Sequence, residues 1–191
     1  RGGATVHVSS TTDGVSIDAC IILRAKSKSL EFRTKVDWRA SERFLKVDIP
    51  MAIQADRAQY ECQYGMVERP IQKNTRSDEA KYESCTHRFV RVADAGYAAA
   101  VVNASTYGSD VSPIHRNTAS GPVRGTMIRL SLLSSPLYPD PNTDKGVHEF
   151  AWNVVADASM PAVLDEANRL NAAVLPAVPA FDPLAQLNPV D

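Results

Sequence analysis

Hydrolysis of a glycoside needs two carboxyl groups, one as a general acid and one as a nucleophile or base. Six acidic residues lie in or near polar segments where they could serve: Glu61, Glu68, Asp78, Glu83, Asp110 and Asp140. Spacing alone pairs no two of them, because residues distant in sequence meet only through the fold. Exposed carboxylates are also the ordinary means of keeping a surface soluble, so these acids by themselves indicate no reaction.

The histidines are too scattered to indicate a metal site, which needs several converging ligands. They are His7, His87, His115 and His148. The strongest candidate cluster is Asp140, Asp144 and His148, at intervals of four residues. That interval suits a helix, but the segment is rich in proline. We interpret it as a solvated loop leading into a strand, and we expect this chain to bind no metal.

Motifs for nucleophilic catalysis and phosphate binding are missing from the sequence. The run Tyr107-Gly108-Ser109-Asp110 comes nearest to the Gly-x-Ser-x-Gly elbow of serine hydrolases and lacks its second glycine. The phosphate-binding pattern Gly-x-Gly-x-x-Gly does not occur. A His and a carboxylate in one cleft could interconvert sugar anomers. His87 with Glu83 is the one tempting pair, although a shared strand explains their closeness better.

Residues 63–70 combine an aromatic residue, a charge pair and a proline at the end of a strand-like run. Arg69 can pair with a neighbouring carboxylate, or donate hydrogen bonds to sugar hydroxyls or to a partner surface. We interpret the segment as a structural anchor, with ligand binding as the alternative.

Composition argues against several classes of function. Lysine and arginine number 21 against 22 aspartate and glutamate, a formal charge of −1, so no nucleic-acid partner is indicated. No run of about 18 apolar residues occurs, so no membrane span is predicted. The cysteines Cys20, Cys62 and Cys85 lack Cys-x-x-Cys spacing and are expected to be buried thiols.

Alternating apolar and polar residues predict β-strands along most of the chain. The pattern is clearest over residues 29–38, where Glu31 falls on the polar face, and over residues 44–49, where Lys46 falls on the polar face. Ala40 to Arg43 are predicted as a turn between two antiparallel strands, and Pro50 as a stop. Further strands are predicted over residues 15–24, 58–64, 85–92, 97–103, 126–133 and 146–155. Hairpin turns are predicted at Asp13-Gly14 and Asp94-Ala95-Gly96. Polar loops are predicted over residues 65–84, 107–125 and 134–145.

One helix is predicted near the end of the chain, from about Met160 to Ala173. Ser159 can cap its first turn, and an apolar stripe of Val163, Leu164, Ala167 and Leu170 follows. The segment after Pro176 has no strand period and is expected to be an extended arm or linker. These patterns predict an all-β class: about nine antiparallel strands in a sandwich over residues 1–158, then a helix and a Pro-rich arm over residues 159–191.

Several motifs occur in a fixed order along the chain. The first group is the run from Glu61 to Pro70, then Asn74-Thr75, then the run from Tyr82 to Phe89. Later motifs include Gly96-Tyr97, Tyr107-Gly108 with Asp110-Val111, the run over residues 129–133, Pro139-Asp140-Pro141 and Gly146-Val147-His148. Val36-Asp37-Trp38 and Leu45-Lys46-Val47 form a predicted strand pair ahead of them. In order and spacing these motifs resemble the C-terminal β-region of the α-mannosidases of glycoside hydrolase family 38, over roughly residues 15 to 175.

The resemblance implies an antiparallel supersandwich of the galactose-mutarotase-like kind, C-terminal to a zinc-bearing catalytic barrel absent from this chain. In the family, the zinc ligands and the Asp nucleophile of the retaining reaction come from that barrel. We therefore expect no catalytic residue here and zinc bound outside the chain. The expected partners are the missing N-terminal catalytic domain of the same polypeptide and a mannose-containing oligosaccharide. The chain opens on a strand-like run without an initiator methionine, as a piece of a longer polypeptide would.

The resemblance also suggests two groups of site residues. The candidates for a substrate-proximal loop are Ser134, Asp140, Asp144 and His148. Motif positions expected to be structural or at a domain interface are Tyr64, Glu68, Arg69, Asn74, His87, Tyr107 and Asp110.

The sequence departs from the family pattern at two positions. Ser77 stands where the family usually has Trp, and Ser134 stands where it usually has Arg. The second change would remove a hydrogen-bond donor from a loop near the active-site mouth.

The alternative to a structural domain is a stand-alone carbohydrate-binding module. In that reading Tyr64, Tyr107 and Tyr138 stack on sugar faces.

Overall fold

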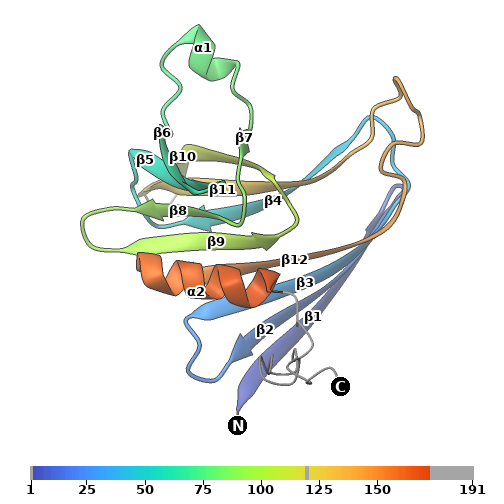
Figure 1. The fold of residues 1–191 in the computed structure, drawn as a ribbon. Helices are drawn as coiled ribbons and strands as arrows, with labels where there is room; N and C mark the ends of the chain where they lie inside the picture. Colours follow the sequence, from blue (N-terminus) through green and yellow to red (C-terminus); the bar gives the residue numbers. More distant parts are fainter. Residues whose placement is uncertain (1, 119–120, 173–191) are drawn as a thin grey trace, which may run out of the picture.

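The computed structural model describes residues 2–118 and 121–172, which form two antiparallel sheets and two helices (Figure 1). The larger sheet has eight strands in the spatial order β1-β2-β3-β12-β9-β8-β5-β6. They are β1 (Gly3–Thr12), β2 (Val15–Arg24), β3 (Ser29–Trp38), β5 (Arg57–Cys62), β6 (Gly65–Pro70), β8 (Phe89–Ala93), β9 (Ala98–Ala104) and β12 (Gly146–Ala156). The smaller sheet, in the order β4-β11-β10-β7, consists of β4 (Phe44–Met51), β7 (Ser84–Cys85), β10 (Gly108–Thr118) and β11 (Gly121–Ser134). The predicted all-β antiparallel class is confirmed.

The main core lies between the two sheets. Ile128 and Leu130 of β11 are fully buried in one cluster with Val101 and Trp152 of the larger sheet. Phe32 of β3 stacks on Trp152, with ring centroids 5.3 Å apart and ring planes 10° apart. Both inner faces are apolar because side chains alternate along each strand, so the sheets stabilise one another by removing these faces from water.

A second core lies on the opposite face of the larger sheet, under α2 (Met160–Asn171), as Figure 1 shows. Val163 and Ala167 of the helix are buried against Phe89, Val102 and Val155 of the strands. Leu170 packs against the same cluster, so three residues of the predicted apolar stripe are confirmed, whereas Leu164 is exposed. The described residues contain no helix long and apolar enough to cross a bilayer.

The helix begins where predicted, but its cap differs from the expectation. Ser159 is the N-cap residue, yet its side chain makes no capping hydrogen bond, and its carbonyl accepts from the Val163 N–H at 3.0 Å. The predicted end at Ala173 and the predicted Pro-rich arm lie outside the described residues.

Periodicity located many of the strands well. The predicted ranges 15–24 and 29–38 are the bounds of β2 and β3, and the predicted strand over residues 146–155 matches β12. Hairpins at Asp13-Gly14 and Asp94-Ala95-Gly96 join β1 to β2 and β8 to β9 as expected.

Two of the predicted loops are wrong in large part. Residues 107–125 contain all of β10 and the start of β11, which pair along the whole eleven-residue length of β10. Residues 65–84 contain β6 and the short helix α1 (Arg76–Glu79), which Thr75 and Asp78 cap reciprocally. Ser, Asn and Pro in these segments weaken an isolated strand, but the ladder supplied by a neighbouring strand outweighs that preference.

The predicted turn between β3 and β4 is also wrong. These strands belong to different sheets, so residues 40–43 cross between the layers instead of closing a hairpin. The crossing segment bonds a distant loop: the Glu42 N–H donates to the Ser135 carbonyl at 2.6 Å, and the Ser135 N–H donates to the Arg43 carbonyl at 3.0 Å. Strand β4 also continues past the predicted stop at Pro50, because proline is tolerated on an edge strand.

The cysteines are less buried than predicted. Cys20 and Cys62 are half-buried and Cys85 is exposed, and all three are free thiols. Cys85 is exposed because β7 is a two-residue strand at the edge of the smaller sheet, where no further layer covers it.

Candidate functional site

The richest concentration of charged side chains surrounds a cleft of about 550 Å³, which we call the charged cleft. It lies beside β6, α1, β7 and β10, where the edge of the larger sheet approaches the smaller one. Its charged lining residues are Glu68, Arg69, Lys73, Asp78, Lys81, Glu83 and Asp110. Tyr60, Val67, Ile71 and Val111 supply apolar and aromatic surface.

Lys46 and Asp110 are at the centre of an ion-pair network on this side of the smaller sheet. The Lys46 ammonium lies 2.8 Å from a Glu83 carboxylate oxygen and 3.0 Å from Asp110 Oδ2. The other oxygen of Asp110 accepts from Arg129 at 2.8 Å, and Arg129 also pairs with Asp48 at 3.3 Å. The strand register makes this possible, because it places Asp110, Arg129 and Asp48 side by side on β10, β11 and β4.

The network fixes the charge state of its lysine. Burial lowers the pKa of Lys46, but hydrogen bonds to Glu83 and Asp110 outweigh burial and raise that pKa above its ordinary value. Lys46 is therefore an ammonium ion at neutral pH.

An aromatic residue forms part of the cleft wall. Tyr60 is 4% exposed, and burial raises the pKa of its phenol to about 12. The Arg69 guanidinium lies over the Tyr60 ring, 5.6 Å from the ring centroid. This cation–π contact holds Arg69 at the cleft wall, and its anchoring role stays a prediction.

The structure brings several sequence-predicted residues together at the charged cleft. Glu68, Arg69 and Asp110 line it, and so do Asp78 and Glu83 from the initial group of carboxylates. Glu68 accepts from Gln59 at 2.7 Å, within the β5–β6 ladder. Asp78 caps α1 and does not face a partner carboxylate, and the Thr75 hydroxyl is the main cause that lowers the pKa of Asp78. Asn74 immediately precedes Thr75, the N-cap residue of α1.

His87 and Tyr107 form a separate group with Glu61 and Arg88. The His87 and Tyr107 rings stack with centroids 6.0 Å apart, and His87 Nδ1 lies 3.6 Å from Glu61 Oε2. Glu61 is 6% exposed and is held by the Arg88 side chain and the Arg88 N–H. Glu83 instead contacts Lys46 and Ser131. His87 and Glu83, which the sequence suggested as a pair, therefore contact different residues.

The candidates for a substrate-proximal loop do cluster, and their hydrogen bonds stabilise the loop itself. Asp144 Oδ2 accepts from the Ser134 N–H at 2.9 Å, and His148 Nε2 contacts the Asp144 carbonyl at 2.8 Å. Asp140 accepts from the Asn142 N–H at 2.8 Å, in a local turn. Three members of the predicted group thus hold the two ends of the β11–β12 loop together.

The described residues do not fit a zinc ion. No three His, Cys, Asp or Glu side chains within residues 2–118 and 121–172 are grouped as a metal site would require. The acidic side chains of the Asp140 to His148 segment instead bond backbone N–H groups.

The three tyrosines proposed as a sugar platform lie in three separate segments. Tyr64 lies in the β5–β6 turn, Tyr107 immediately precedes β10, and Tyr138 lies in the β11–β12 loop. Tyr64 and Tyr138 are almost wholly exposed, whereas Tyr107 is engaged with His87.

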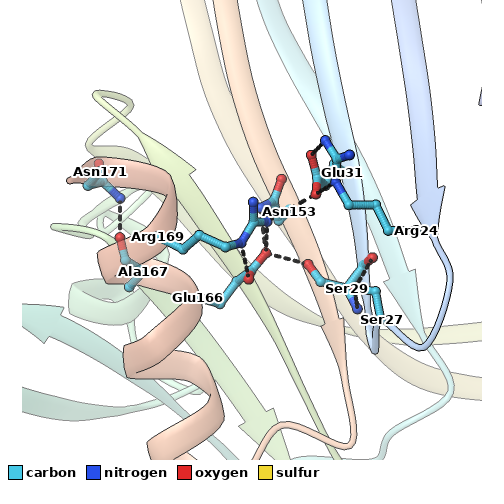
Figure 2. A network of polar contacts seen from close by, with 9 residues as sticks. All are labelled: Arg24, Ser27, Ser29, Glu31, Asn153, Glu166, Ala167, Arg169 and Asn171. Atoms are coloured by element: carbon cyan, nitrogen blue, oxygen red, sulfur yellow. Dashed lines mark hydrogen bonds and ion pairs between the residues drawn. The ribbon is translucent and has the colours of Figure 1, made fainter. Parts of the chain in front are cut away.

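A polar network under α2 escaped the sequence reasoning (Figure 2). Glu31 is 1% exposed, although alternation placed it on the polar face of β3, and it pairs with Arg24 at 2.8 Å and Arg169 at 3.2 Å. Glu166 of α2 accepts from Ser29 at 2.5 Å and Asn153 at 2.6 Å. The sequence did contain a signal for this network. Helix α2 carries acidic and basic residues beside its apolar stripe, and β3 carries Ser and Glu on the face that meets the helix.

We expect Asp110→Asn to lower the free energy of unfolding by ~1–3 kcal/mol, because two half-buried cations each lose an ionic hydrogen bond. Urea unfolding of the variant would measure the loss. The matched control is Asp48→Asn, which contacts the same Arg129 from a more exposed position and should cost ~1 kcal/mol or less. Equal losses for both variants would contradict a special role for Asp110.

Glu166 predicts a pH dependence of stability. Its pKa is lowered from 4.5 to about 2, chiefly by the hydrogen bond from Arg169 and against the effect of burial. A carboxyl with a depressed pKa stabilises the fold above its ordinary pKa, and that contribution is lost as pH falls toward the folded value. We therefore expect a loss of roughly 2–3 kcal/mol between pH 4.5 and pH 2.

Thermal unfolding across this pH range would test the dependence. Glu166→Gln should flatten the curve, whereas Asp165→Asn, an exposed carboxylate on the same helix, should leave it steep. A wild-type curve as flat as that of Glu166→Gln would contradict the assignment.

Comparison with known proteins places this geometry in a family. A model described as "Glycosyl hydrolases family 38 C-terminal domain" matches residues 1–142. Two relatives named "Alpha-mannosidase 2C1", from Mus musculus and Homo sapiens, are each 32% identical over 166 residues, which is 85% of this chain. The "Alpha-mannosidase" of Saccharomyces cerevisiae is 34% identical over 141 residues, which is 73% of this chain.

The fold agrees with a solved structure. The crystal structure of an alpha-mannosidase from Enterococcus faecalis V583 superposes with a TM-score of 0.65 at 16% identity, over 80% of this chain and 17% of that chain. This chain spans 15% of the length of the two mammalian relatives and 12% of the yeast relative. The sequence match over residues 1–142 and the identity to named relatives confirm the resemblance, and the chain belongs to the family of glycosyl hydrolase family 38 C-terminal domains.

Proposed function

We propose that this chain is the C-terminal, substrate-flanking domain of a longer, retaining, zinc-dependent α-mannosidase that hydrolyses terminal α-mannosides of oligosaccharides. One observation carries the proposal: relatives named alpha-mannosidase are 32% identical over 85% of this chain, while it spans 15% of their length. In this proposal the chain supplies a scaffold, and the catalytic barrel of the same polypeptide performs the chemistry.

The electrostatics of the charged cleft support a scaffolding role. A retaining glycosidase needs a carboxyl that keeps its proton near neutral pH, next to a second carboxylate about 5 Å away. Glu83 and Asp110 are instead held by the Lys46 ammonium, and Asp110 also by Arg129. Both side chains are thus already engaged in ion pairs, which suits them to a structural role.

The proposal places zinc on the barrel, because the described residues of this chain do not fit the ion. There the metal would supply Lewis-acid chemistry. The residues proposed to flank the substrate are those of the β11–β12 loop, which Ser134, Asp144 and His148 close at its base.

The test compares two proteins on one substrate. The 191-residue chain alone, with zinc, should not release the aryl group from an aryl α-mannoside. The longer polypeptide that contains it should do so, and should lose that activity to a chelator. Turnover by the chain alone would refute the non-catalytic role, and inactivity of the zinc-loaded longer polypeptide on all α-mannosides would refute the assignment to a mannosidase.

Carbohydrate binding by the chain itself has one specific observation in its favour. Tyr64 is fully exposed and has a φ of 65°, in the left-handed region that is costly for a bulky residue. Residues held in costly backbone conformations are concentrated at ligand sites. An aromatic ring presented in this way could stack on a sugar face.

Calorimetric titration with mannose oligosaccharides would test this second role. Tryptophan fluorescence suits it poorly, because Trp38 and Trp152 are 2% and 5% exposed and lie in the core. Tyr64→Asn should abolish sugar binding, while it relieves about 1 kcal/mol of backbone strain. Unchanged affinity in that variant would exclude Tyr64 as the contact.

A further inference from the structure

The geometry points to β1 as the docking edge for one further β-strand, contributed by another segment of the same longer polypeptide. We propose that this strand extends the eight-stranded sheet and continues its apolar inner face beyond Val6 and Val8. The inference rests on the proposed function in one respect, namely that the chain is part of a longer polypeptide.

Strand β1 is the last strand on one side of the larger sheet (Figure 1). It pairs with β2 without a break, from Gly3 opposite Arg24 to Thr12 opposite Val15. All ten of its residues are exposed. A regular strand of this length, without a bulge, presents a straight row of backbone groups to any neighbour.

The register shows which backbone groups face outward. The Ala25 N–H donates to the Gly2 carbonyl at 3.0 Å, so Gly2 and Ala25 face each other as a hydrogen-bonded pair. Hydrogen-bonded and non-hydrogen-bonded pairs alternate along an antiparallel ladder. The even-numbered residues of β1 therefore bond β2, and the N–H and C=O groups of Gly3, Thr5, His7, Ser9 and Thr11 point to the open edge.

The other sheet edges carry features that block strand addition, and β1 does not. Edge strand β6 contains Glu68, Arg69 and Pro70, and edge strand β4 contains Lys46 and Pro50. Edge strand β7 is two residues long. Charges, prolines and short length are the usual protections of an edge. The β1 sequence GATVHVSSTT has no Lys, Arg, Asp, Glu or Pro.

An uncovered apolar surface accompanies this open edge. Val6 and Val8 are 55% and 47% exposed, and Leu23 of β2 is 45% exposed. Val6 faces Ile21, which in turn faces Phe32, so these side chains share the inner face of the larger sheet. The clusters between the two sheets include Val15 and Ile17 of β2 but no residue of β1. Exposed apolar side chains that continue a core mark a surface built to be covered.

The occupant is inferred from its required chemistry and from the relatives. It must be an extended segment with exposed N–H and C=O groups and with apolar side chains on one face, because β1 itself has no charged residue and its valines adjoin Ile21 and Ala19 on the inner face. Most of the length of the curated relatives lies outside the region that this chain matches. A strand in the same polypeptide is present at high effective concentration, which favours it over a separate molecule.

Hydrogen exchange of the purified longer polypeptide would test the inference. If a strand covers β1, the outward N–H groups of Thr5, His7 and Ser9 should exchange as slowly as the inward ones of Val6 and Val8, roughly 100-fold or more slower than an open edge. The internal control is β2, which is paired on both sides. Size-exclusion chromatography at several concentrations would give the oligomeric state.

Each outcome decides the matter. Slow outward amides in a monomer support the inference. Fast outward amides beside slow inward ones would overturn it, and slow amides that become fast on dilution of a dimer would assign the edge to a second copy instead. Mannosidase activity is measured separately: an active polypeptide with an open β1 edge refutes only this inference, and an inactive one with a covered edge refutes only the proposed function.

Discussion

Replacing Arg88 by methionine is expected to lower the free energy of unfolding by ~3–5 kcal/mol. The reason is the environment of Glu61, whose side chain is 8% exposed and pairs with Arg88. Two guanidinium nitrogens of Arg88 bond this carboxylate, and the third donates to Asn168 of α2 at 2.7 Å. Hydrogen bonding to Glu61 is the main cause that raises the pKa of Arg88 above its already high ordinary value.

Removing one partner of a buried ion pair costs more than the pair itself contributes. Without Arg88, the Glu61 carboxylate keeps the Arg88 N–H and a nearby His87, but it loses its main counter-charge in a site with little water. Glu61→Met together with Arg88→Met removes both charges. The double variant should therefore recover much of the loss.

Urea unfolding of the 191-residue chain would measure these effects. Arg57→Met is the matched control, because Arg57 of β5 pairs with Glu68 at 3.5 Å and both side chains are about half exposed. That change should cost ~1 kcal/mol or less. A loss for Arg88→Met no larger than for Arg57→Met would show that Glu61 is adequately solvated without its partner.

The part of the fold that sequence predicted is the part governed by local pattern. Strands β2 and β3 were located to the residue, because one face of each is apolar and alternation has no competing interpretation. Strand β10 was missed because its Ser, Pro, His and Asn residues have little strand preference of their own. Its stability comes from pairing with β11, which no local window contains.

Only some residues of the candidate site could be predicted from the sequence, because the contacts that join them are long-range. The resemblance pointed to Glu68, Arg69 and Asp110, and all three line the charged cleft. Lys46, which holds Asp110, was read only as the polar side of a strand, since 64 residues separate the two. Glu31 was likewise assigned to solvent, because α2, whose Arg169 it contacts, lies 138 residues further along the chain.

Phe89→Ala is the second substitution expected to have a large effect, a loss of ~3–5 kcal/mol in the free energy of unfolding. Phe89 is 0% exposed and lies in the cluster between the larger sheet and α2. Truncation removes the ring from an apolar site and leaves a cavity that the rigid sheet cannot close, so transfer and cavity terms add. The matched control is Phe44→Ala, at a position that is 50% exposed on β4, which should cost far less.

The same substitution distinguishes a local from a global role for the helix. Val163 and Ala167 are the buried residues of α2, and both belong to the Phe89 cluster, so a cavity there weakens the main apolar contact that holds α2. Amide exchange of α2 should therefore accelerate more than that of β11, which packs in the separate core between the sheets. Equal acceleration in both elements would instead show that helix and sandwich unfold as one unit. In that case the polar network of Glu31, Glu166 and Arg169 would have to hold α2 in place without the ring.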